Sequence, residues 1–217
     1  MDAQKRPGGG GMSAGGGIGG GIRGGGSGGG ARGGNSGEAG RPARWPVAGP
    51  LTLLGMPGAG KSTVARVLAE RFGVPIFDGD VEIERRSGRH HSELLAELGR
   101  EGFLDHEAEV LRSVAPEPMV VAPGGSVVYR ERAVEHLRRL GPVIYLYVPE
   151  EVLAGRVGPL GPRGVVLGPG QTFGDLFRER DPMYASAAHA AVRSGEEPPE
   201  ATAERVIRAA AELSPNG

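Results

Sequence analysis

Short apolar runs alternate with segments of helical periodicity from Leu51 to the end of the chain. The apolar runs predict five strands, at residues 51–54, 75–78, 119–122, 143–148 and 189–192. The segments between and after them predict helices at residues 61–72, 81–114 with breaks at Gly88, Gly99 and Gly102, 129–140, 149 onward, 172–180, 182–188 and 199–213. Strands that alternate with helices are typical of a parallel sheet covered by helices, so we expect an α/β fold.

The first 46 residues differ in composition from the rest of the chain. The chain has 41 glycines, and roughly half of them precede Pro50. Such a stretch has too few apolar side chains to offset the entropy lost on ordering. We therefore expect residues 1–46 to be a disordered Gly-rich tail and residues 47–217 to form a single domain. Arg-Gly-Gly elements in the tail resemble RNA-binding segments, but a flexible spacer is the favoured interpretation.

Composition excludes several classes of function. The formal net charge is −1, so the chain as a whole lacks the excess of positive charge with which proteins bind nucleic acid. Cysteine is absent, which excludes disulfides, thiolate nucleophiles and cysteine-based metal sites. No apolar run approaches the length that spans a membrane. We expect a soluble, cytoplasmic monomer that binds neither nucleic acid nor membrane.

Residues 55–63 read GMPGAGKST and lie between the first predicted strand and the first predicted helix. The spacing from Gly55 to Gly60, followed by Lys61 and Ser62, is that of a phosphate-binding loop, or Walker A motif. In such a loop the backbone N–H groups surround the phosphates, the lysine neutralises them and the serine hydroxyl binds Mg²⁺. The sequence therefore predicts a nucleoside triphosphate site, against the alternative of a Gly-rich turn before a helix.

Asp78 and Asp80 stand at the end of the second predicted strand. The carboxyl ends of parallel strands meet at one edge of a sheet, so both carboxylates are expected near the terminal phosphate. Asp78 is a candidate to hold Mg²⁺ through water. Asp80 is a candidate catalytic residue that accepts a hydrogen bond from the hydroxyl to be phosphorylated. The alternative for Asp80 is the N-cap of the next helix.

Further candidates follow the third predicted strand and lie in the last third of the chain. Gly124 and Gly125 would let a ligand meet bare backbone N–H groups, although an ordinary turn uses the same residues. Residues 155–171 are dense in Gly and Pro and predict a lid, or else a surface insertion without function. Arg163 in this segment and Arg180 beyond it are candidates to bind phosphate and a substrate carboxylate, unless they are solvated surface arginines.

Two adjacent histidines, His90 and His91, could suggest a metal site. Neighbouring side chains on a helix diverge by about 100°, and no further His or carboxylate stands at ligand spacing with both. We therefore interpret these histidines as a solvated pair.

From Leu51 to about Leu213 the chain resembles the shikimate kinase family of P-loop kinases. The resemblance rests on GMPGAGKSTVARVLAERFGVPIFDGD, the Gly-rich turn after the third strand, VIYLYV followed by PEEVLAGR, and RERDPMYASAAHAAV, which is similar to the family's R-x-P-x-Y-x-x-x-A pattern. It implies a three-layer P-loop kinase fold, a five-stranded parallel sheet in 2-3-1-4-5 order and an Arg-bearing lid. It also implies phosphorylation of a small hydroxylated carboxylate by ATP, with shikimate as the first candidate, as a step of aromatic amino acid biosynthesis.

The resemblance also implies roles for individual residues. The loop residues that would hold the ATP phosphates are Gly58, Ala59, Gly60, Lys61, Ser62 and Thr63. The residues that would bind the substrate are Asp80, Gly124, Gly125 and Arg180. Arg163 would reach ATP from the lid, and Mg²⁺ would lie near Ser62 and Asp78. Lys61 and Asp80 would be the catalytic residues.

One segment departs from the family pattern. The family's G-E-x-x-F-R-x-x-E reads here as residues 99–107, with Leu104 where the substrate-binding Arg is expected and Arg100 in place of the first Glu. Losing a charge-assisted hydrogen bond costs on the order of 1.5–3 kcal/mol. Arg100, one helical turn from Leu104, is a candidate replacement. The sequence therefore leaves open a kinase for another hydroxylated metabolite, such as a sugar acid, and a non-catalytic ATP-binding module.

Overall fold

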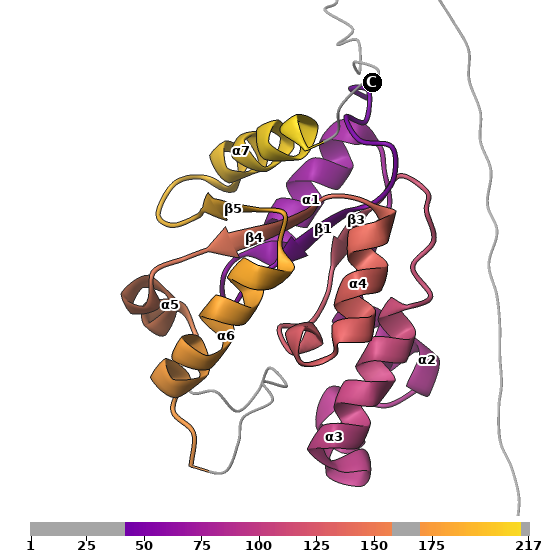
Figure 1. Cartoon of the computed structure of the whole chain (residues 1–217), viewed down its shortest axis with the longest axis vertical. Helices are drawn as coiled ribbons and strands as arrows, with labels where there is room; N and C mark the ends of the chain where they lie inside the picture. The colour runs from indigo at the N-terminus through magenta and orange to yellow at the C-terminus, as the bar shows by residue number, and fades with distance from the viewer. Residues whose placement is uncertain (1–41, 158–169, 214–217) are drawn as a thin grey trace, which may run out of the picture. The chain divides into compact units, whose positions relative to one another are not determined.

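The computed structural model describes residues 42–157 and 170–213, which form a parallel sheet with helices on both faces. The strands are β1 (Leu51–Leu54), β2 (Ile76–Asp78), β3 (Val120–Ala122), β4 (Val143–Tyr147) and β5 (Ala190–Arg193). They pair in parallel in the order β2-β3-β1-β4-β5 (Figure 1). The expected α/β class and strand order are confirmed.

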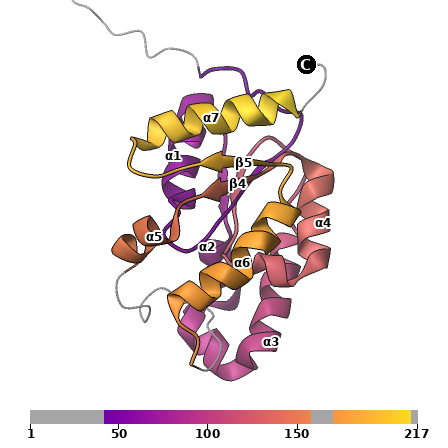
Figure 2. The same cartoon turned by 60° about the vertical axis from the view of Figure 1, so that its left-hand side comes forward.

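The helices cover both faces of the sheet and its carboxyl edge (Figures 1 and 2). They are α1 (Lys61–Phe72), α2 (Gly79–Ser87), α3 (His91–Leu111), α4 (Glu131–Leu140), α5 (Glu150–Arg156), α6 (Phe173–Ala187) and α7 (Pro199–Glu212), with a short 3-10 turn, η1 (Val127–Tyr129), before α4. α1 and α7 pack together on one face, and α4 and α6 lie on the other. α2 and α5 follow the carboxyl ends of β2 and β4, and α3 packs against α2 and α4.

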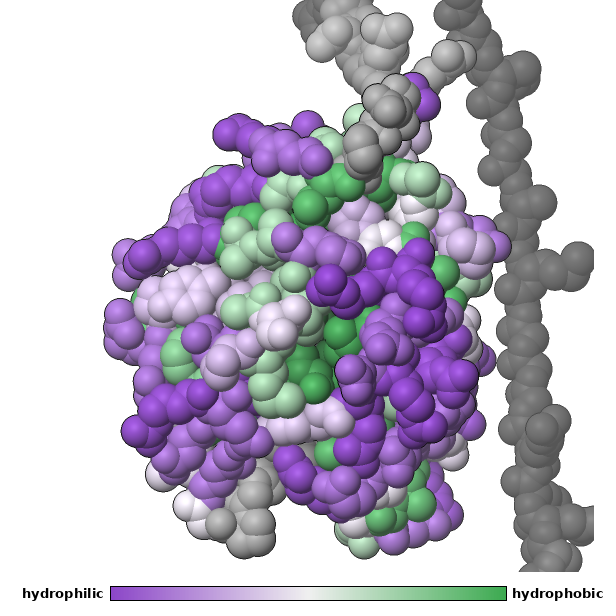
Figure 3. Space-filling view, in the orientation of Figure 1, coloured by the Kyte–Doolittle hydropathy of each residue, from purple (hydrophilic) through white to green (hydrophobic). Residues whose placement is uncertain are grey.

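The sheet forms the centre of the hydrophobic core because helices bury it on both faces. Leu51, Leu53, Ile144 and Leu146 have no exposed surface, and apolar side chains of the helices pack against them. Fully burying one such side chain stabilises the fold by about 1.5–3 kcal/mol. In the view of Figure 3, apolar residues reach the surface mainly between α4 and α6, whereas hydrophilic residues dominate the two sides.

Two helical segments differ from the expectation. α6 continues through Pro182, where the sequence predicted two separate helices. Leu176 before the proline and Tyr184 after it have no exposed surface. Burial of both halves therefore stabilises one continuous helix, although Pro182 cannot make a backbone hydrogen bond. The break at Gly88 is confirmed, since this residue ends α2, but α3 is kinked only at Gly99, where φ is 66° and ψ is 178°. α3 runs through Gly102 without interruption.

Residues 42–46 belong to the predicted tail, and they contact the domain. The N–H of Ala43 donates to the carbonyl of Arg71, and the Trp45 ring packs edge-on against Phe72 at 5.5 Å between centroids. The rest of the predicted tail and most of the predicted lid, Arg163 included, lie outside the described residues. Within the ranges that the structure describes, no helix is long and apolar enough to cross a membrane.

Candidate active site

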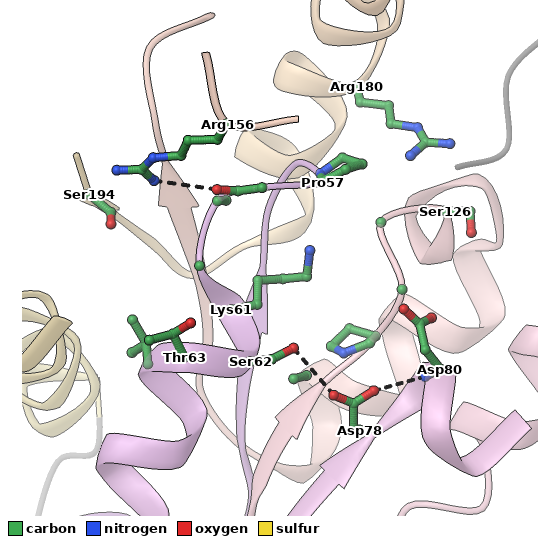
Figure 4. Close-up of a pocket in the computed structure, with 18 of the residues that line it drawn as sticks. Pro57, Lys61, Ser62, Thr63, Asp78, Asp80, Ser126, Arg156, Arg180 and Ser194 are labelled. Atoms are coloured by element: carbon green, nitrogen blue, oxygen red, sulfur yellow. Dashed lines mark hydrogen bonds between the residues drawn. The ribbon is translucent and has the colours of Figure 1, made fainter. Parts of the chain in front are cut away.

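The loops that follow β1, β2 and β3 open onto one cavity at the carboxyl edge of the sheet (Figure 4). Its volume is about 530 Å³, within the range of small-molecule sites. The carboxyl ends of parallel strands share one edge, and this brings residues from distant parts of the chain together. The predicted site residues that line the cavity are Gly58, Ala59, Gly60, Lys61, Ser62, Thr63, Asp78, Asp80, Gly124, Gly125 and Arg180.

The loop between β1 and α1 has a backbone that is open to a ligand. Gly60 has a φ of 90°, a left-handed conformation that favours glycine, and no atom lies within 4 Å of the position that a Cβ would take. The N–H groups and the dipole at the start of α1 favour an anion at this point. The Lys61 ammonium donates to the carbonyls of Gly55 and Met56, at 2.8 and 3.3 Å. Burial lowers the pKa of Lys61 to about 8, against the opposing effect of nearby carboxylates.

Ser62 and Asp78 place two oxygen ligands side by side. The Ser62 hydroxyl donates to Asp78 Oδ2 at 3.3 Å, and Asp78 Oδ1 accepts from the N–H groups of Asp80 and Val81. Asp78, not Asp80, is therefore the N-cap of α2. Hydroxyl and carboxylate oxygens suit Mg²⁺, which usually completes its shell with phosphate and water. Such outside ligands would be needed, because the described residues contain no group of three or more His, Cys, Asp or Glu that could hold a metal.

Asp80 lies across the cavity from Lys61 (Figure 4). Its side chain is 60% exposed, and its Oδ1 lies 3.3 Å from His91 Nε2. Burial raises the pKa of Asp80, but the His91 imidazole and the Lys61 ammonium outweigh it and hold the pKa below its usual value. The expectation of a solvated histidine pair is correct for His90, which is exposed, and wrong for His91. The His91 side chain is only 9% exposed, because its ring packs against Phe103.

Glu107 is a buried carboxyl group in the cavity wall, which the sequence placed at the end of the family pattern over residues 99–107 without giving it a role. It is 1% exposed, and its Oε2 accepts a 2.6 Å hydrogen bond from the Ser126 hydroxyl. Burial raises the pKa of Glu107 to about 7, although the Ser126 hydrogen bond opposes this effect. Gly124 packs against two carboxylates, since a Cβ there would overlap Glu107 Oε1 and lie 2.9 Å from Asp80 Oδ1. The turn after β3 therefore leaves no space for a side chain at this position.

Arg180 reaches the cavity from α6. Its Nε donates to the Tyr129 hydroxyl at 3.1 Å, and its guanidinium carbon lies 4.9 Å from the centre of that ring. The Tyr184 hydroxyl donates to the Gly125 carbonyl at 2.6 Å, which fixes α6 to the turn after β3. A Cβ at Gly125 would lie 3.1 Å from Arg180 Nη1. Arg180 and the Gly125 backbone therefore share one corner of the cavity.

The opposite end of the cavity is formed by α5 and the connection between β5 and α7. Arg156 Nη1 donates to the Gly58 carbonyl in the phosphate-binding loop at 3.3 Å (Figure 4), and Nη2 contacts the Gly195 carbonyl. Ser194 and Thr202 line the same end. Sequence reasoning gave Arg156 no role, although this residue ends PEEVLAGR, one of the segments that carry the family resemblance. Only the fold shows that it reaches the phosphate-binding loop.

Known proteins resemble the chain across this site. The family model described as shikimate kinase matches residues 57–211. The chain belongs to the shikimate kinase family. A shikimate kinase of Thermobifida fusca is 42% identical over 158 residues, which are 72% of this chain and 91% of the relative. One of Chromohalobacter salexigens is 37% identical over 170 residues, covering 76% and 93%. The structure of Acinetobacter baumannii shikimate kinase in complex with shikimate is similar at a TM-score of 0.68 and 31% identity, covering 77% of this chain and 96% of that one.

In this member of the shikimate kinase family, the segment that departs from the family pattern lies beside the cavity. Leu104 has no exposed surface and is not among the residues that line the cavity. Arg100, the candidate replacement, is not among the residues that line the cavity; its guanidinium lies 4.7 Å from the Tyr129 ring centre and pairs with Glu101. Arg100 and Arg180 therefore share Tyr129, but Arg180 alone of the two reaches the cavity.

Proposed function

We propose that the protein transfers the γ-phosphoryl group of ATP to a hydroxyl of shikimate, which gives shikimate 3-phosphate. The observation that carries this proposal is that the phosphate-binding loop and the residues expected to bind the acceptor line the same cavity. Membership of the shikimate kinase family supports the same reaction, since the curated relatives align with most of this chain.

In the donor half of the cavity, residues 58–63 hold the ATP phosphates. Lys61, already buried beside the loop carbonyls, turns its ammonium to the phosphate oxygens. Ser62 and Asp78 would hold Mg²⁺, which would neutralise further phosphate charge. The nucleoside extends towards Arg156, because the loop fixes the phosphates and the cavity continues to that end. Arg163 is assigned to ATP by the family resemblance alone.

In the acceptor half, Asp80 accepts a hydrogen bond from the reacting hydroxyl, and Arg180 binds the substrate carboxylate. The backbone of Gly124 and Gly125 faces the acceptor where no side chain intervenes. The hydroxyl oxygen attacks the γ-phosphorus, ADP leaves, and the hydroxyl proton passes to Asp80. The transition state of such a transfer is loose, so catalysis depends mainly on positioning and on neutralising charge.

The position of Leu104 favours testing a second acceptor. Among the described residues that line the cavity, Arg180 is the arginine at the acceptor end and Arg156 the one at the nucleotide end. A single arginine binds any small carboxylate, so a sugar acid is the second candidate. A monomeric state, a cytoplasmic location and the lack of nucleic-acid binding stay predictions from the sequence.

The test is release of ADP by the purified protein with shikimate, with gluconate and without an acceptor. We expect release that depends on shikimate, and a phosphate ester of shikimate as the product in ³¹P NMR. Asp80→Asn is the matched control, which should bind ATP and lose most of the turnover. Release only with gluconate would move the assignment to a sugar acid. ATP binding without turnover on either acceptor would favour a non-catalytic module.

A further inference from the structure

His91 is the first residue of α3, and its ring forms part of the cavity wall. The Nδ1 atom lies 3.1 Å from Glu84 Oε1 of α2, and the ring centre lies 5.4 Å from that of Phe103. Because these contacts come from α2 and from the part of α3 beyond the kink at Gly99, the orientation of the imidazole is fixed. Its other nitrogen, Nε2, faces Asp80.

The contact between His91 and Asp80 is close but incomplete. Nε2 lies 3.3 Å from Asp80 Oδ1, yet this buried nitrogen has no partner in hydrogen-bond geometry. A buried polar atom without a partner is costly, and a partner is normally found. The Asp80 side chain is 60% exposed and therefore has room to rotate, whereas the His91 ring does not. A small rotation of Asp80 completes the hydrogen bond.

The charges around His91 favour an imidazolium ion. Asp80 and Glu84 face it from α2, Glu107 lies further along α3, and the exposed His90 contacts Glu84 at 3.5 Å. The Asp80 carboxylate, and more weakly that of Glu84, raise the pKa of His91 to about 9, against the effect of burial. Carboxylates therefore outnumber the nearby cations on this side of the cavity.

We infer that His91 is a positioning residue, which links Glu84 to Asp80 and turns the Asp80 carboxylate to the acceptor hydroxyl. This inference rests on the proposed function, in which Asp80 meets that hydroxyl. An imidazolium held from behind by one carboxylate presents its second N–H in a fixed direction. The reacting hydroxyl then meets a carboxylate whose orientation is fixed. His91 does not need to touch the substrate to act in this way.

Turnover of single and double variants tests the inference. His91→Leu removes the N–H donors, and we expect kcat with shikimate to fall on the order of ten- to a hundred-fold, with KM for ATP unchanged. His91→Gln keeps a donor near Nε2 and should recover part of the loss. In an Asp80→Asn background, His91→Leu should cost little more, because the interaction is already lost. His106→Leu, on the same helix and outside the cavity lining, is the matched control and should keep wild-type turnover.

An equal loss from His91→Leu in both backgrounds would overturn the inference, as would an unchanged kcat in an active, folded variant. A second measurement applies even if shikimate proves not to be the acceptor. The ring nitrogens of His91 can be titrated by NMR in the wild type and in Asp80→Asn, without any substrate. We expect the pKa of His91 to fall in Asp80→Asn. An unchanged pKa would refute the contact itself, whereas an inactive wild type with the expected fall would refute only the proposed acceptor.

Discussion

The buried carboxyl group of Glu107 makes the stability of the protein depend on pH. Its pKa is raised by burial from 4.5 to about 7, so the folded protein holds this proton more tightly than the unfolded chain does. The stability that comes from the neutral group is therefore complete below about pH 4.5 and is lost as the pH rises through about 7. Glu107→Gln keeps the shape and the hydrogen bond from Ser126 but carries no charge at any pH.

The size of the effect follows from the displacement of the pKa. Each unit by which the pKa differs between the folded and unfolded states corresponds to about 1.4 kcal/mol. The full change in the free energy of unfolding is therefore on the order of 3 kcal/mol. Most of this change takes place between about pH 5 and about pH 8. Over that interval the free energy of unfolding of the wild type should fall by roughly 2–3 kcal/mol more than that of Glu107→Gln. Other groups titrate in the same window, His91 among them, but they contribute to both proteins and cancel in the comparison.

Urea unfolding of both proteins at the two pH values measures the difference. Glu109→Gln is the matched control, because Glu109 lies on the same helix with its side chain 60% exposed, and it should follow the wild type. The reasoning is refuted if Glu107→Gln loses as much free energy of unfolding as the wild type between the two pH values. That result would mean that Glu107 is solvated or is held ionised by neighbouring cations.

Three further predictions concern the cavity. Gly124→Ala should lower kcat roughly ten-fold, because the new Cβ pushes Glu107 Oε1 and Asp80 Oδ1 aside. Overpacking of this kind also costs about 1–3 kcal/mol of stability. Steady-state kinetics, with circular dichroism to confirm folding, would check it. Arg156→Ala should raise KM for ATP several-fold and leave KM for shikimate unchanged, since the Arg156 side chain contacts Gly58 at the nucleotide end. An equal rise in both constants would contradict this. Lys61→Met should lower kcat by at least a hundred-fold, because the charge that neutralises the phosphates is lost. Its midpoint of thermal unfolding should stay within a few degrees of the wild type or rise, because an apolar side chain replaces a buried ammonium.

The sequence predicted the strands well because their signals are local, whereas the strand order came from the family resemblance. Each strand is an apolar run too short for a helix, and Gly73 and Gly88 end helices where a left-handed residue is needed. The predicted helix boundary at Pro182 was wrong, since a proline within a helical pattern normally marks the end of a helix. There the tertiary contacts of Leu176 and Tyr184 decide the outcome, and no local pattern reports them.

The site divides in the same way between local and tertiary signals. Asp78, Asp80 and Gly124 were predictable, because they follow strands whose carboxyl ends must share one edge. His91 and Glu107 lie on a helix, where the direction of a side chain depends on how the helix packs and on the kink at Gly99. The rule that adjacent histidines on a helix diverge does not hold here, because His90 is the extended N-cap of α3 and both rings contact Glu84 Oε1.

The two halves of the cavity are built in different ways, and this bears on how the acceptor can change. One continuous segment forms the phosphate-binding loop, and its backbone at Gly60 is open to a ligand. The proposed acceptor half combines side chains of α2, α3 and α6 with the backbone of Gly124 and Gly125, so we expect a substitution in one of these helices to alter recognition without moving the loop. His91 and Leu104 both lie on α3, the helix that also carries Glu107. A change of acceptor within this fold should therefore be found first in α3, with ATP binding preserved.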